Sequence, residues 1–248
     1  MTMRYEDKVA LVTGAGAGIG RAVAKRLASE GAAIVAVDHN GERLSTALRQ
    51  LASASTLALE CDIADEAAVQ AAVAATIARF GKIDVLINNA GIGDTQGRLH
   101  EVPPDRWDQI MAVNVRGAFL MTRSVIPEML RAGGGAIINM ASLGSFRATA
   151  GASPYITSKG AMLSMTRAAA LEYVRDNIRV NAVCPGTTNT EILANLPQEQ
   201  MEMLIARIPQ GRLGEPDEVA ALVAFLASNE AKHITGGAYI IDGGRCAG

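Results

Sequence analysis

The regular alternation of short β-branched runs with longer alanine- and leucine-rich stretches constrains this chain's fold more than any other feature. The run from Ala33 to Val37 is apolar at every position, as expected of a strand that is buried on both faces within a parallel sheet. Seven such runs predict seven strands: Val9 to Thr13, Ile34 to Asp38, Leu57 to Asp62, Val85 to Asn88, Ala136 to Met140, Arg179 to Val183 and Ala238 to Asp242.

Helical patterns fill the segments between these runs, and glycine, proline or polar residues bound each of them. They cover about Gly20 to Ser29, Gly41 to Ala52, Glu66 to Phe80, Asp105 to Ala132, Tyr155 to Arg175 and Pro216 to Ser228. Strands that alternate with helices form a doubly wound α/β sheet with helices on both faces, and ligands bind beyond the carboxyl ends of the strands. No linker or repeat divides the chain, so we expect a single domain over residues 1–248.

The segment from Thr187 to Gly214 breaks this rhythm, because it is long, rich in Met and Leu, and directly follows a strand. A connection of this length is uncommon in a compact domain unless it is functional. We therefore expect a substrate lid inserted at about residues 187–214. Within it, Met201, Met203 and Leu204 fit either an apolar substrate pocket or an ordinary packed helix face.

Charge and cysteine usage exclude several classes of function. A formal net charge of −2, a pI near 6.0 and the lack of a lysine- or arginine-rich run argue against a nucleic-acid partner. Cys61, Cys184 and Cys246 are far apart and the three histidines are scattered, so we expect neither a metal site nor a disulfide. The apolar stretch from Val9 to Val12 is too short for a signal sequence or a membrane span, so a cytoplasmic location is the default expectation.

A glycine-rich turn, Thr13-Gly14-Ala15-Gly16-Ala17-Gly18-Ile19-Gly20, directly follows the first predicted strand and opens a helix. Glycines let the backbone turn sharply and approach a pyrophosphate, whose charge is met by free N–H groups and the positive end of the helix dipole. The spacing is Gly14-x3-Gly18-x-Gly20 and not GxGxxG, so this turn alone is weak evidence.

Asp38 strengthens this interpretation, because it ends the second predicted strand, 18 positions after Gly20. A carboxylate at this place accepts hydrogen bonds from the adenosine ribose hydroxyls and repels a 2′-phosphate. No arginine or lysine stands within the glycine turn or directly after Asp38 to bind such a phosphate. The sequence therefore predicts NAD and not NADP, although Asp38 alone could also be a helix N-cap.

Tyr155 and Lys159 are four residues apart in a segment with a helical pattern, which places both side chains on one face. A free tyrosine has a pKa near 10, too high for a base at neutral pH, and a nearby ammonium stabilises the tyrosinate. A Tyr-x3-Lys pair is common, however, and by itself is typical of a solvated helix face.

With these features in place, the sequence resembles the short-chain dehydrogenase/reductase family along essentially its whole length. Its motifs occur in the family's order: Thr13-Gly14-x3-Gly18-x-Gly20, Asp38, Asp62, Asn88-Asn89-Ala90-Gly91, Asn114, Ser142, Tyr155-x3-Lys159 and Pro185-Gly186. The resemblance implies a Rossmann-type fold with a hydride-transferring site.

The resemblance also implies roles for four catalytic residues. Tyr155 would be the general acid/base, and Ser142 would position the substrate oxygen and stabilise charge on it. Lys159 would lower the tyrosine pKa and bind the nicotinamide ribose. Asn114 would hold a water that relays the proton to solvent. Without the resemblance, Asn114 and Ser142 would be ordinary amide and strand-end residues making local backbone bonds.

Cofactor contacts follow from the same resemblance. Thr188 and Thr190 would hold the carboxamide, through a backbone group and a hydroxyl respectively, and Thr188 departs from the family's usual aliphatic residue. The full set of expected cofactor-binding residues is Gly14, Gly18, Ile19, Gly20, Asp38, Asp62, Ile63, Asn89, Ala90, Gly91, Tyr155, Lys159, Pro185, Gly186, Thr188 and Thr190.

We therefore predict an enzyme that transfers a hydride between NAD and a secondary alcohol or ketone. A catalytically silent NAD-binding protein, used for sensing or assembly, is the alternative. The substrate is expected to be small to medium in size, such as a polyol, a hydroxyacid derivative or a cyclic alcohol, and positions including Asp94, Gln96, Leu143 and Phe146 would select it. Family resemblance implies a homotetramer or dimer built partly on the helices from Asp105 to Ala132 and Tyr155 to Arg175, without a membrane partner.

Overall fold

The computed structural model describes residues 3–49, 51, 55–93, 97–194 and 196–247. Its central feature is a sheet of seven parallel strands in the order β3-β2-β1-β4-β5-β6-β7, which confirms the predicted doubly wound α/β fold. The strands are β1 (Val9–Thr13), β2 (Ala33–Asp38), β3 (Thr56–Glu60), β4 (Val85–Asn88), β5 (Gly135–Met140), β6 (Ile178–Pro185) and β7 (Ala238–Ile241).

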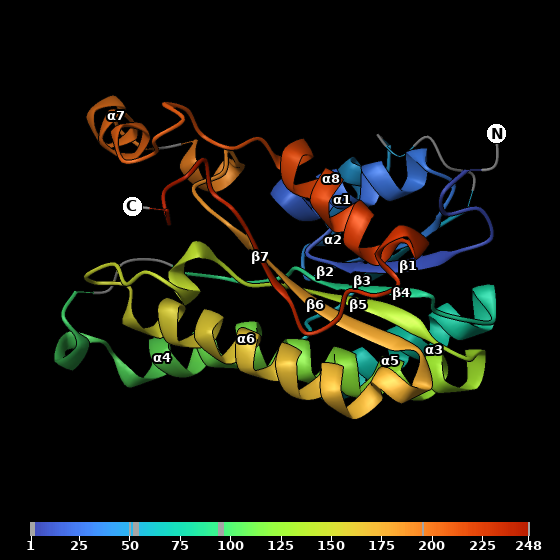
Figure 1. Cartoon of the computed structure of the whole chain (residues 1–248). Coiled ribbons are helices and arrows are strands. Elements are labelled where there is room, and N and C mark those ends of the chain that lie inside the picture. The colour runs from blue at the N-terminus through green and yellow to red at the C-terminus, as the bar shows by residue number, and fades with distance from the viewer. Residues whose placement is uncertain (1–2, 50, 52–54, 94–96, 195, 248) are drawn as a thin grey trace.

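Helices cover both faces of this sheet (Figure 1). Helices α1 (Gly18–Ser29), α2 (Gly41–Leu48) and α8 (Pro216–Ala227) lie on one face, and α3 (Glu66–Phe80), α4 (Pro104–Met111), α5 (Ala118–Ala132) and α6 (Ser153–Tyr173) lie on the other. Each face has its own apolar core, one around α1 and α8 and one around α3 and α5. Burial on both faces explains why the strand sequences are continuously apolar.

The strand order reverses between β1 and β4, because β1 pairs with β2 on one side and β4 on the other. The chain leaves these two strands in opposite directions, which opens a crevice at their carboxyl ends. The glycine turn after β1 and the segment after β4 both lie at this position.

Several boundaries differ from the expected ones. The segment expected as one helix from Asp105 to Ala132 contains α4, a π-helical segment at Ala112–Gly117, and α5. A π turn keeps the direction of the helix, so the apolar pattern did not reveal it. Strand β3 ends at Glu60 because the Asp62 carboxylate accepts the Ala64 N–H at 2.9 Å and begins a turn. Ala52, the expected end of the second helix, lies outside the described residues.

The segment between β6 and α8 leaves the sheet and contains the further helix α7 (Gln198–Ala206), which projects beyond the carboxyl ends of the strands (Figure 1). Its place agrees with the expected insertion at 187–214, and its function as a lid remains a prediction. In the part of the chain that the structure describes, no helix is long and apolar enough to cross a membrane.

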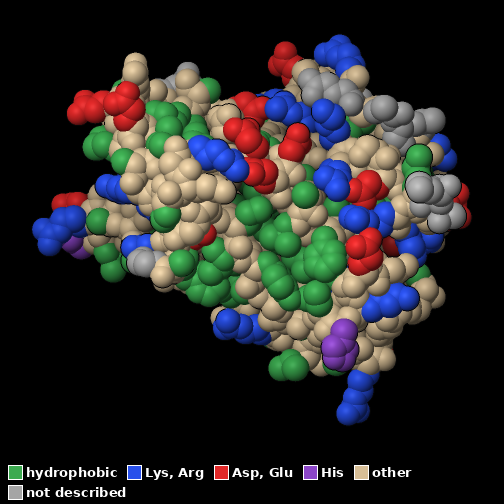
Figure 2. Space-filling model, turned by 45° about the horizontal axis from the view of Figure 1, so that its top comes forward, with side chains coloured by type: hydrophobic (Ala, Val, Ile, Leu, Met, Phe, Trp, Pro, Cys, Tyr) green, Lys and Arg blue, Asp and Glu red, His purple; other side chains and the backbone are tan. Residues whose placement is uncertain are grey.

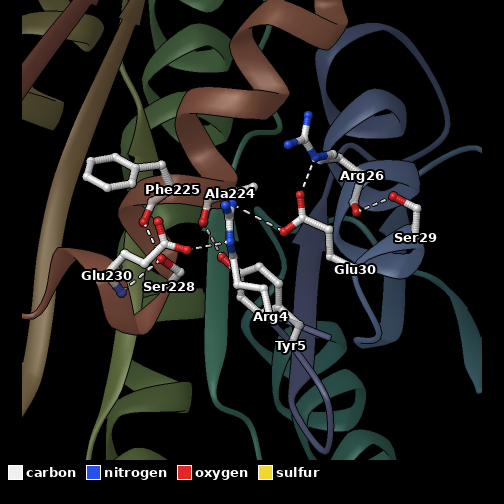
Figure 3. A network of polar contacts seen from close by, with 9 residues as sticks. All are labelled: Arg4, Tyr5, Arg26, Ser29, Glu30, Ala224, Phe225, Ser228 and Glu230. Atoms are coloured by element: carbon white, nitrogen blue, oxygen red, sulfur yellow. Dashed lines mark hydrogen bonds and ion pairs between the residues drawn. The ribbon is translucent and has the colours of Figure 1, made fainter. Parts of the chain in front are cut away.

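A polar network fastens the N-terminal segment to α1 and α8 (Figure 3). The buried Tyr5 hydroxyl donates to the carbonyl of Ala224 in the last turn of α8, where the Ser228 N–H donates to the Phe225 carbonyl instead. Arg4 forms ion pairs with Glu30 at 3.2 Å and with Glu230 at 2.9 Å. These contacts hold the end of α8 against the rest of its layer.

Acidic and basic side chains are interspersed on the face that Figure 2 draws, around a central hydrophobic patch.

Candidate active site

The glycine turn after β1 is folded so tightly that side chains would collide. Gly14 and Gly18 have φ values of +65° and +51°, a region that L-residues rarely adopt. A Cβ on Gly20 would lie 2.0 Å from the Gly14 carbonyl oxygen and 2.4 Å from Asn89 Nδ2. The turn therefore needs glycine at these positions, and it exposes its backbone at the start of α1, where Ile19 follows Gly18.

The ends of β1 and β4 are joined by Thr13 and Asn89. Thr13 Oγ1 accepts the backbone N–H groups of Asn89 and Ala90, each at 3.0 Å, and donates to the Ile87 carbonyl at 3.2 Å. Asn89 Nδ2 donates to the Thr13 carbonyl at 2.9 Å. These bonds fix the Asn89-Ala90-Gly91 segment beside the glycine turn, so the structure brings two of the predicted motifs together.

An anionic group already lies at the N-terminus of α1. Glu191, from the segment after β6, accepts the Gly18 N–H at 3.0 Å through Oε2 and pairs with Arg21 at 2.6 Å through Oε1. Burial raises the pKa of the Glu191 carboxyl, but backbone hydrogen bonds and Arg21 outweigh it and lower that pKa below its usual value. The start of α1 therefore stabilises negative charge in this structure, as a phosphate site requires.

Asp38 lies at the end of β2, beside the glycine turn, and its side chain is nearly buried. Its Oδ2 accepts the Gly16 N–H at 2.9 Å and its Oδ1 accepts the Asn40 N–H at 3.0 Å. Arg43 lies close by, since its Cβ is 3.0 Å from where a Cβ on Gly16 would stand. The carboxylate thus faces the loop that would hold an adenosine, and Arg43, which sequence reasoning did not consider, begins its side chain beside the same loop.

Asp62 and Ile63 follow β3 at the same edge of the sheet. Asp62 is exposed, whereas Ile63 is buried against the helix that passes over it. A Cβ on Gly117 would lie 2.7 Å from the Ile63 side chain, so this contact seats the π-helical segment against β3's end.

Tyr155 and Lys159 lie one turn apart at the start of α6, as predicted. Lys159 Nζ is 5.7 Å from the centre of the Tyr155 ring and donates to the Met140 carbonyl at 2.8 Å. Ser142 follows β5. Its Oγ and the Tyr155 ring both lie close to Gly144, because a Cβ on that glycine would be 3.4 Å from Ser142 Oγ and 3.7 Å from Tyr155 Cε1. The structure therefore gathers Ser142, Tyr155 and Lys159 at the carboxyl end of β5.

Burial dominates the electrostatics of these groups. It raises the pKa of Tyr155 above its usual value, and a hydrogen bond with Ser142 acts in the opposite direction. It lowers the pKa of Lys159 to about 8, because the ammonium is removed from water. The pKa of Tyr155 is thus shifted upward in this structure, opposite to the lowering expected from Lys159.

Asn114 lies in the π-helical segment and is almost fully buried. Its Oδ1 accepts the Ile92 N–H at 2.8 Å, and its Nδ2 donates to the Ile92 carbonyl at 2.8 Å and to Ser158 Oγ at 2.9 Å. Asn114 Oδ1 and Lys159 Nζ flank Gly91, at 3.2 and 3.3 Å from where its Cβ would stand. Asn114 therefore fixes the segment after β4 against α6.

That fixed segment in turn supports the tyrosine. A Cβ on Gly93 would lie 2.3 Å from Tyr155 Cδ2, so the backbone of Gly93 packs directly on the ring. Ser158, which also donates to the Tyr155 carbonyl at 2.6 Å, was not singled out from the sequence. Its position, one residue before Lys159 in the predicted helix, is the sequence feature that could have identified it.

A second buried network lies behind the site. Asn88 Nδ2 donates to Thr122 Oγ1 and to Asn139 Oδ1, both at 2.9 Å, and Asn139 Nδ2 donates to Thr166 Oγ1 at 2.8 Å. Buried polar groups of this kind are tolerated when they are paired, as these donors are, whereas the buried Asn88 Oδ1 has no hydrogen-bond partner. The network ties β4 and β5 to α5 and α6 and so helps to align the strand ends that carry the site.

Pro185 and Gly186 lie at the end of β6. A Cβ on Gly186 would be 2.8 Å from Asp242 Cα, so the glycine permits close packing against the chain after β7. Thr188 donates through Oγ1 to the Gly186 carbonyl at 3.2 Å, and Thr190 Cγ2 lies 3.2 Å from the Cβ position of Gly18. The expected carboxamide-binding threonines thus lie between the glycine turn and β6.

Two hollows flank these residues. One, of about 580 Å³, lies between Gly18 and the Thr190–Glu191 region. The other, of about 680 Å³, is lined by Ser142 and Tyr155 and also by arginines that sequence reasoning did not select. Of the expected substrate-selecting positions, Leu143 lines this second hollow, whereas Asp94 and Gln96 lie outside the described residues. Among the described residues, no group of three His, Cys, Asp or Glu could hold a metal ion.

Known proteins resemble this chain over nearly its full length. A family model described as enoyl-(acyl carrier protein) reductase matches residues 14–245. The chain is 44% identical over 244 residues to 2-(R)-hydroxypropyl-CoM dehydrogenase of Xanthobacter autotrophicus, with 96% of this chain and 98% of that protein covered.

Solved structures give the same result. The crystal structure of levodione reductase matches with a TM-score of 0.95 and 38% identity, covering 98% of this chain and 99% of that one. The crystal structure of 3-ketoacyl-(acyl-carrier-protein) reductase from Brucella melitensis complexed with NADH matches with a TM-score of 0.92 and 41% identity, at the same coverage.

Proposed function

Because this chain belongs to the short-chain dehydrogenase/reductase family, we propose that it is an NAD(H)-dependent oxidoreductase that interconverts a secondary alcohol and its ketone. The observation that carries this proposal is the convergence of Ser142, Tyr155 and Lys159 at the end of β5, beside a glycine turn that accepts an anion. Relatives named as dehydrogenases or reductases favour an enzyme over a silent NAD-binding protein.

The residues at the crevice fit NAD. Gly14, Gly18 and Gly20 let the turn fold tightly at the start of α1, where the Gly18 N–H binds the Glu191 carboxylate and negative charge is stabilised. Asp38 would accept hydrogen bonds from the adenosine ribose, Asp62 and Ile63 would contact the adenine, and Asn89 to Gly91 would line the adenosine. A structural relative is complexed with NADH.

The nicotinamide carboxamide of NAD would bind between the glycine turn and β6. Pro185, Gly186, Thr188 and Thr190 lie there, and Lys159 would hold the nicotinamide ribose from the other side. When bound, NAD supplies or accepts the hydride, so that a ketone, NADH and a proton become a secondary alcohol and NAD.

The protein's own groups would handle the proton and the charge. In reduction Tyr155 would donate its proton to the substrate oxygen. Ser142 hydrogen-bonds the same oxygen and stabilises developing negative charge. Lys159 stabilises the tyrosinate that remains. Asn114 and Lys159 flank Gly91, and a water held between them would return the proton to Tyr155 from solvent.

The assembly proposal is a homotetramer or dimer in the cytoplasm, with residues 187–214 acting as a lid on a single domain. Large apolar side chains are exposed on α5 and α6, with Phe119 at 49% and Leu171 at 81% exposure. Such exposure on long helices suits burial against a second copy. Light scattering at micromolar concentration that reports a monomer would contradict this part of the proposal.

The test of function compares the wild type with Tyr155→Phe. The wild type should interconvert secondary alcohols and ketones with NAD(H) and use NADP(H) poorly, as followed by the near-ultraviolet absorbance of the reduced cofactor. Tyr155→Phe should lose turnover by roughly a thousandfold or more, because the acid/base is removed, yet bind NADH as tightly in a fluorescence titration. Turnover retained by Tyr155→Phe would refute the assignment, and NADH binding without turnover in the wild type would favour the silent alternative.

A further inference from the structure

The hollow beside Ser142 and Tyr155 is lined by positively charged side chains. Three arginines, Arg147, Arg207 and Arg245, line this cavity of about 680 Å³, and no Asp or Glu is among its described lining residues. The chain as a whole has a formal net charge of −2. A cluster of guanidinium groups at the catalytic cavity is therefore a local property, and it calls for a specific explanation.

The three arginines come from segments far apart in the sequence. Arg147 lies between Ser142 and α6, Arg207 directly follows α7, and Arg245 lies near the C-terminus. Figure 1 shows the start of α6, α7 and the C-terminus at one end of the molecule, beyond the carboxyl ends of the strands. The fold thus assembles this cluster where a substrate would enter.

Local contacts hold two of the arginines together. Arg245 Nη1 donates to Thr187 Oγ1 at 3.1 Å, and Arg147 donates through Nη1 to the main-chain carbonyl of Arg245. Arg245 is partly buried. A partly buried guanidinium has lost some of its water, so Arg245 is more receptive to a counter-charge than the exposed Arg147 and Arg207 are.

Two of these three arginines have no carboxylate partner in the part of the chain that the structure describes. Among the described residues, Arg207 and Arg245 form no ion pair with a carboxylate. Asp242 is nearest to Arg245 in the sequence, but its Oδ1 accepts the Gly244 N–H at 2.9 Å and its Oδ2 accepts the Cys246 N–H at 2.7 Å. Arg207 and Arg245 thus line one cavity without a carboxylate partner among the described residues, and they would attract an anionic ligand there.

We propose that the substrate is a secondary alcohol or ketone that carries an anionic group, with Arg245, Arg207 and Arg147 binding the anion while its reacting carbon lies at Ser142 and Tyr155. The inference rests on the proposed function and names its substrate class. Guanidinium forks bind planar oxyanions such as carboxylates in bidentate fashion, and they bind sulfonates and phosphates by the same charge-assisted bonds. Arg207 follows α7, so binding the anion would also draw the expected lid toward the site.

The experiment measures NADH-dependent reduction of straight methyl ketones that end in a carboxylate, over a series of chain lengths, against their methyl esters. Matched ketones that end in a sulfonate or a phosphate distinguish the kinds of anion. For at least one chain length the anion should have a kcat/KM at least roughly tenfold above its ester, the gain expected from charge-assisted hydrogen bonds. Added salt should lower that advantage without changing turnover of the ester.

Variants assign the effect to the arginines. Arg245→Met and, separately, Arg207→Met should lower kcat/KM for the anion by roughly tenfold and leave the ester nearly unchanged. Two variants are used because Arg245 also helps to hold the C-terminal segment through Thr187. Arg175→Met is the matched control, since Arg175 is exposed beyond the far end of α6, about 30 Å along the helix from Tyr155.

The outcomes separate this inference from the proposed function. Esters and simple ketones reduced as well as the anions at every length would overturn the inference while leaving the oxidoreductase intact. Equal losses for anion and ester in both cavity variants would overturn the role of these arginines. Failure to reduce any ketone, charged or neutral, by a protein that binds NADH would instead refute the proposed function itself.

Discussion

Replacing Asn114 with alanine tests the frame that holds the site. The Asn114 amide joins the π-helical segment to the backbone of Ile92 and to Ser158, and it is almost completely shielded from water. Asn114→Ala removes all of these bonds at once and leaves the Ile92 N–H and carbonyl without their partners. The segment that packs on Tyr155 and lies beside Lys159 would then lose its main attachment.

The magnitude follows from the geometry. Three hydrogen bonds of 2.8, 2.8 and 2.9 Å are lost, and each contributes about 1 kcal/mol net. The free energy of unfolding should therefore fall by about 3 kcal/mol, which lowers Tm by roughly 6 to 12 °C in a chain of this size. Because the Ile92 segment also positions Gly91 and Gly93, kcat should fall by at least roughly tenfold.

Urea unfolding followed by circular dichroism measures the stability, and steady-state reduction of a ketone measures kcat. Ser158→Ala removes one of the Asn114 partners and also the bond to the Tyr155 carbonyl, and it should cost about 2 kcal/mol. Asn229→Ala is the matched control, because Asn229 is exposed and its loss should change stability by less than about 0.5 kcal/mol. A loss below about 1 kcal/mol for Asn114→Ala would mean that the π-helical segment holds itself without this amide, and would refute the reasoning.

Three further predictions concern the cofactor, the buried lysine and the N-terminal network. Asp38→Ser should raise the ratio of kcat/KM for NADP to that for NAD by roughly ten- to a hundredfold, because the repelling carboxylate is gone and Arg43 lies beside the glycine turn; an unchanged ratio contradicts this. The folded pKa of Lys159 is about 8 against 10.5 when exposed, so the penalty of burying its charge is fully present below pH 8 and declines as the pH rises toward 10.5. Urea unfolding at several pH values should show that the free energy of unfolding rises between about pH 8 and 10.5 in the wild type and not in Lys159→Met. The same dependence on pH in both proteins would contradict this prediction. Tyr5→Phe should leave the Ala224 carbonyl unpaired and lower stability by about 1 to 2 kcal/mol with unchanged kinetics, as calorimetry and a rate assay would measure; an unaltered Tm would show that the hydroxyl contributes nothing.

The sheet could be predicted from the sequence because strands that are buried on both faces have continuously apolar sequences. Each of the seven strands lies within two residues of its predicted bounds. Helix α3 matches its prediction because Asp65 caps its start through the Ala67 N–H, and Gly81 ends it with a φ of +76°. Local chemistry determines both ends of that helix, so local patterns could find them.

The π-helical segment and the arginine cluster could not be predicted in this way. Residues 112–117 continue the apolar periodicity of their neighbours, and a change from α to π hydrogen bonding leaves no separate pattern in the sequence. Arg147 and Arg245 are 98 positions apart, and they meet only because the ends of β5 and β7 share one edge of the sheet. The pKa of Tyr155 depends on burial by the whole surrounding fold, which a Tyr-x3-Lys motif does not encode.

The π-helical segment makes the position of Asn114 sensitive to insertions and deletions in this part of the chain. An α-helix closes each hydrogen bond over four residues and a π-helix over five, so the segment Ala112–Gly117 accommodates one residue more than regular α-helical spacing would. Deleting that residue would rotate one half of the helix against the other by about 100° and turn Asn114 away from Ile92. Point substitutions do not change chain length and so leave this extra residue in place, whereas an insertion or deletion within the segment would change the register of the helix around it. Among divergent copies of this chain, a gap within these six positions would therefore mark loss of the site even where every catalytic side chain remained.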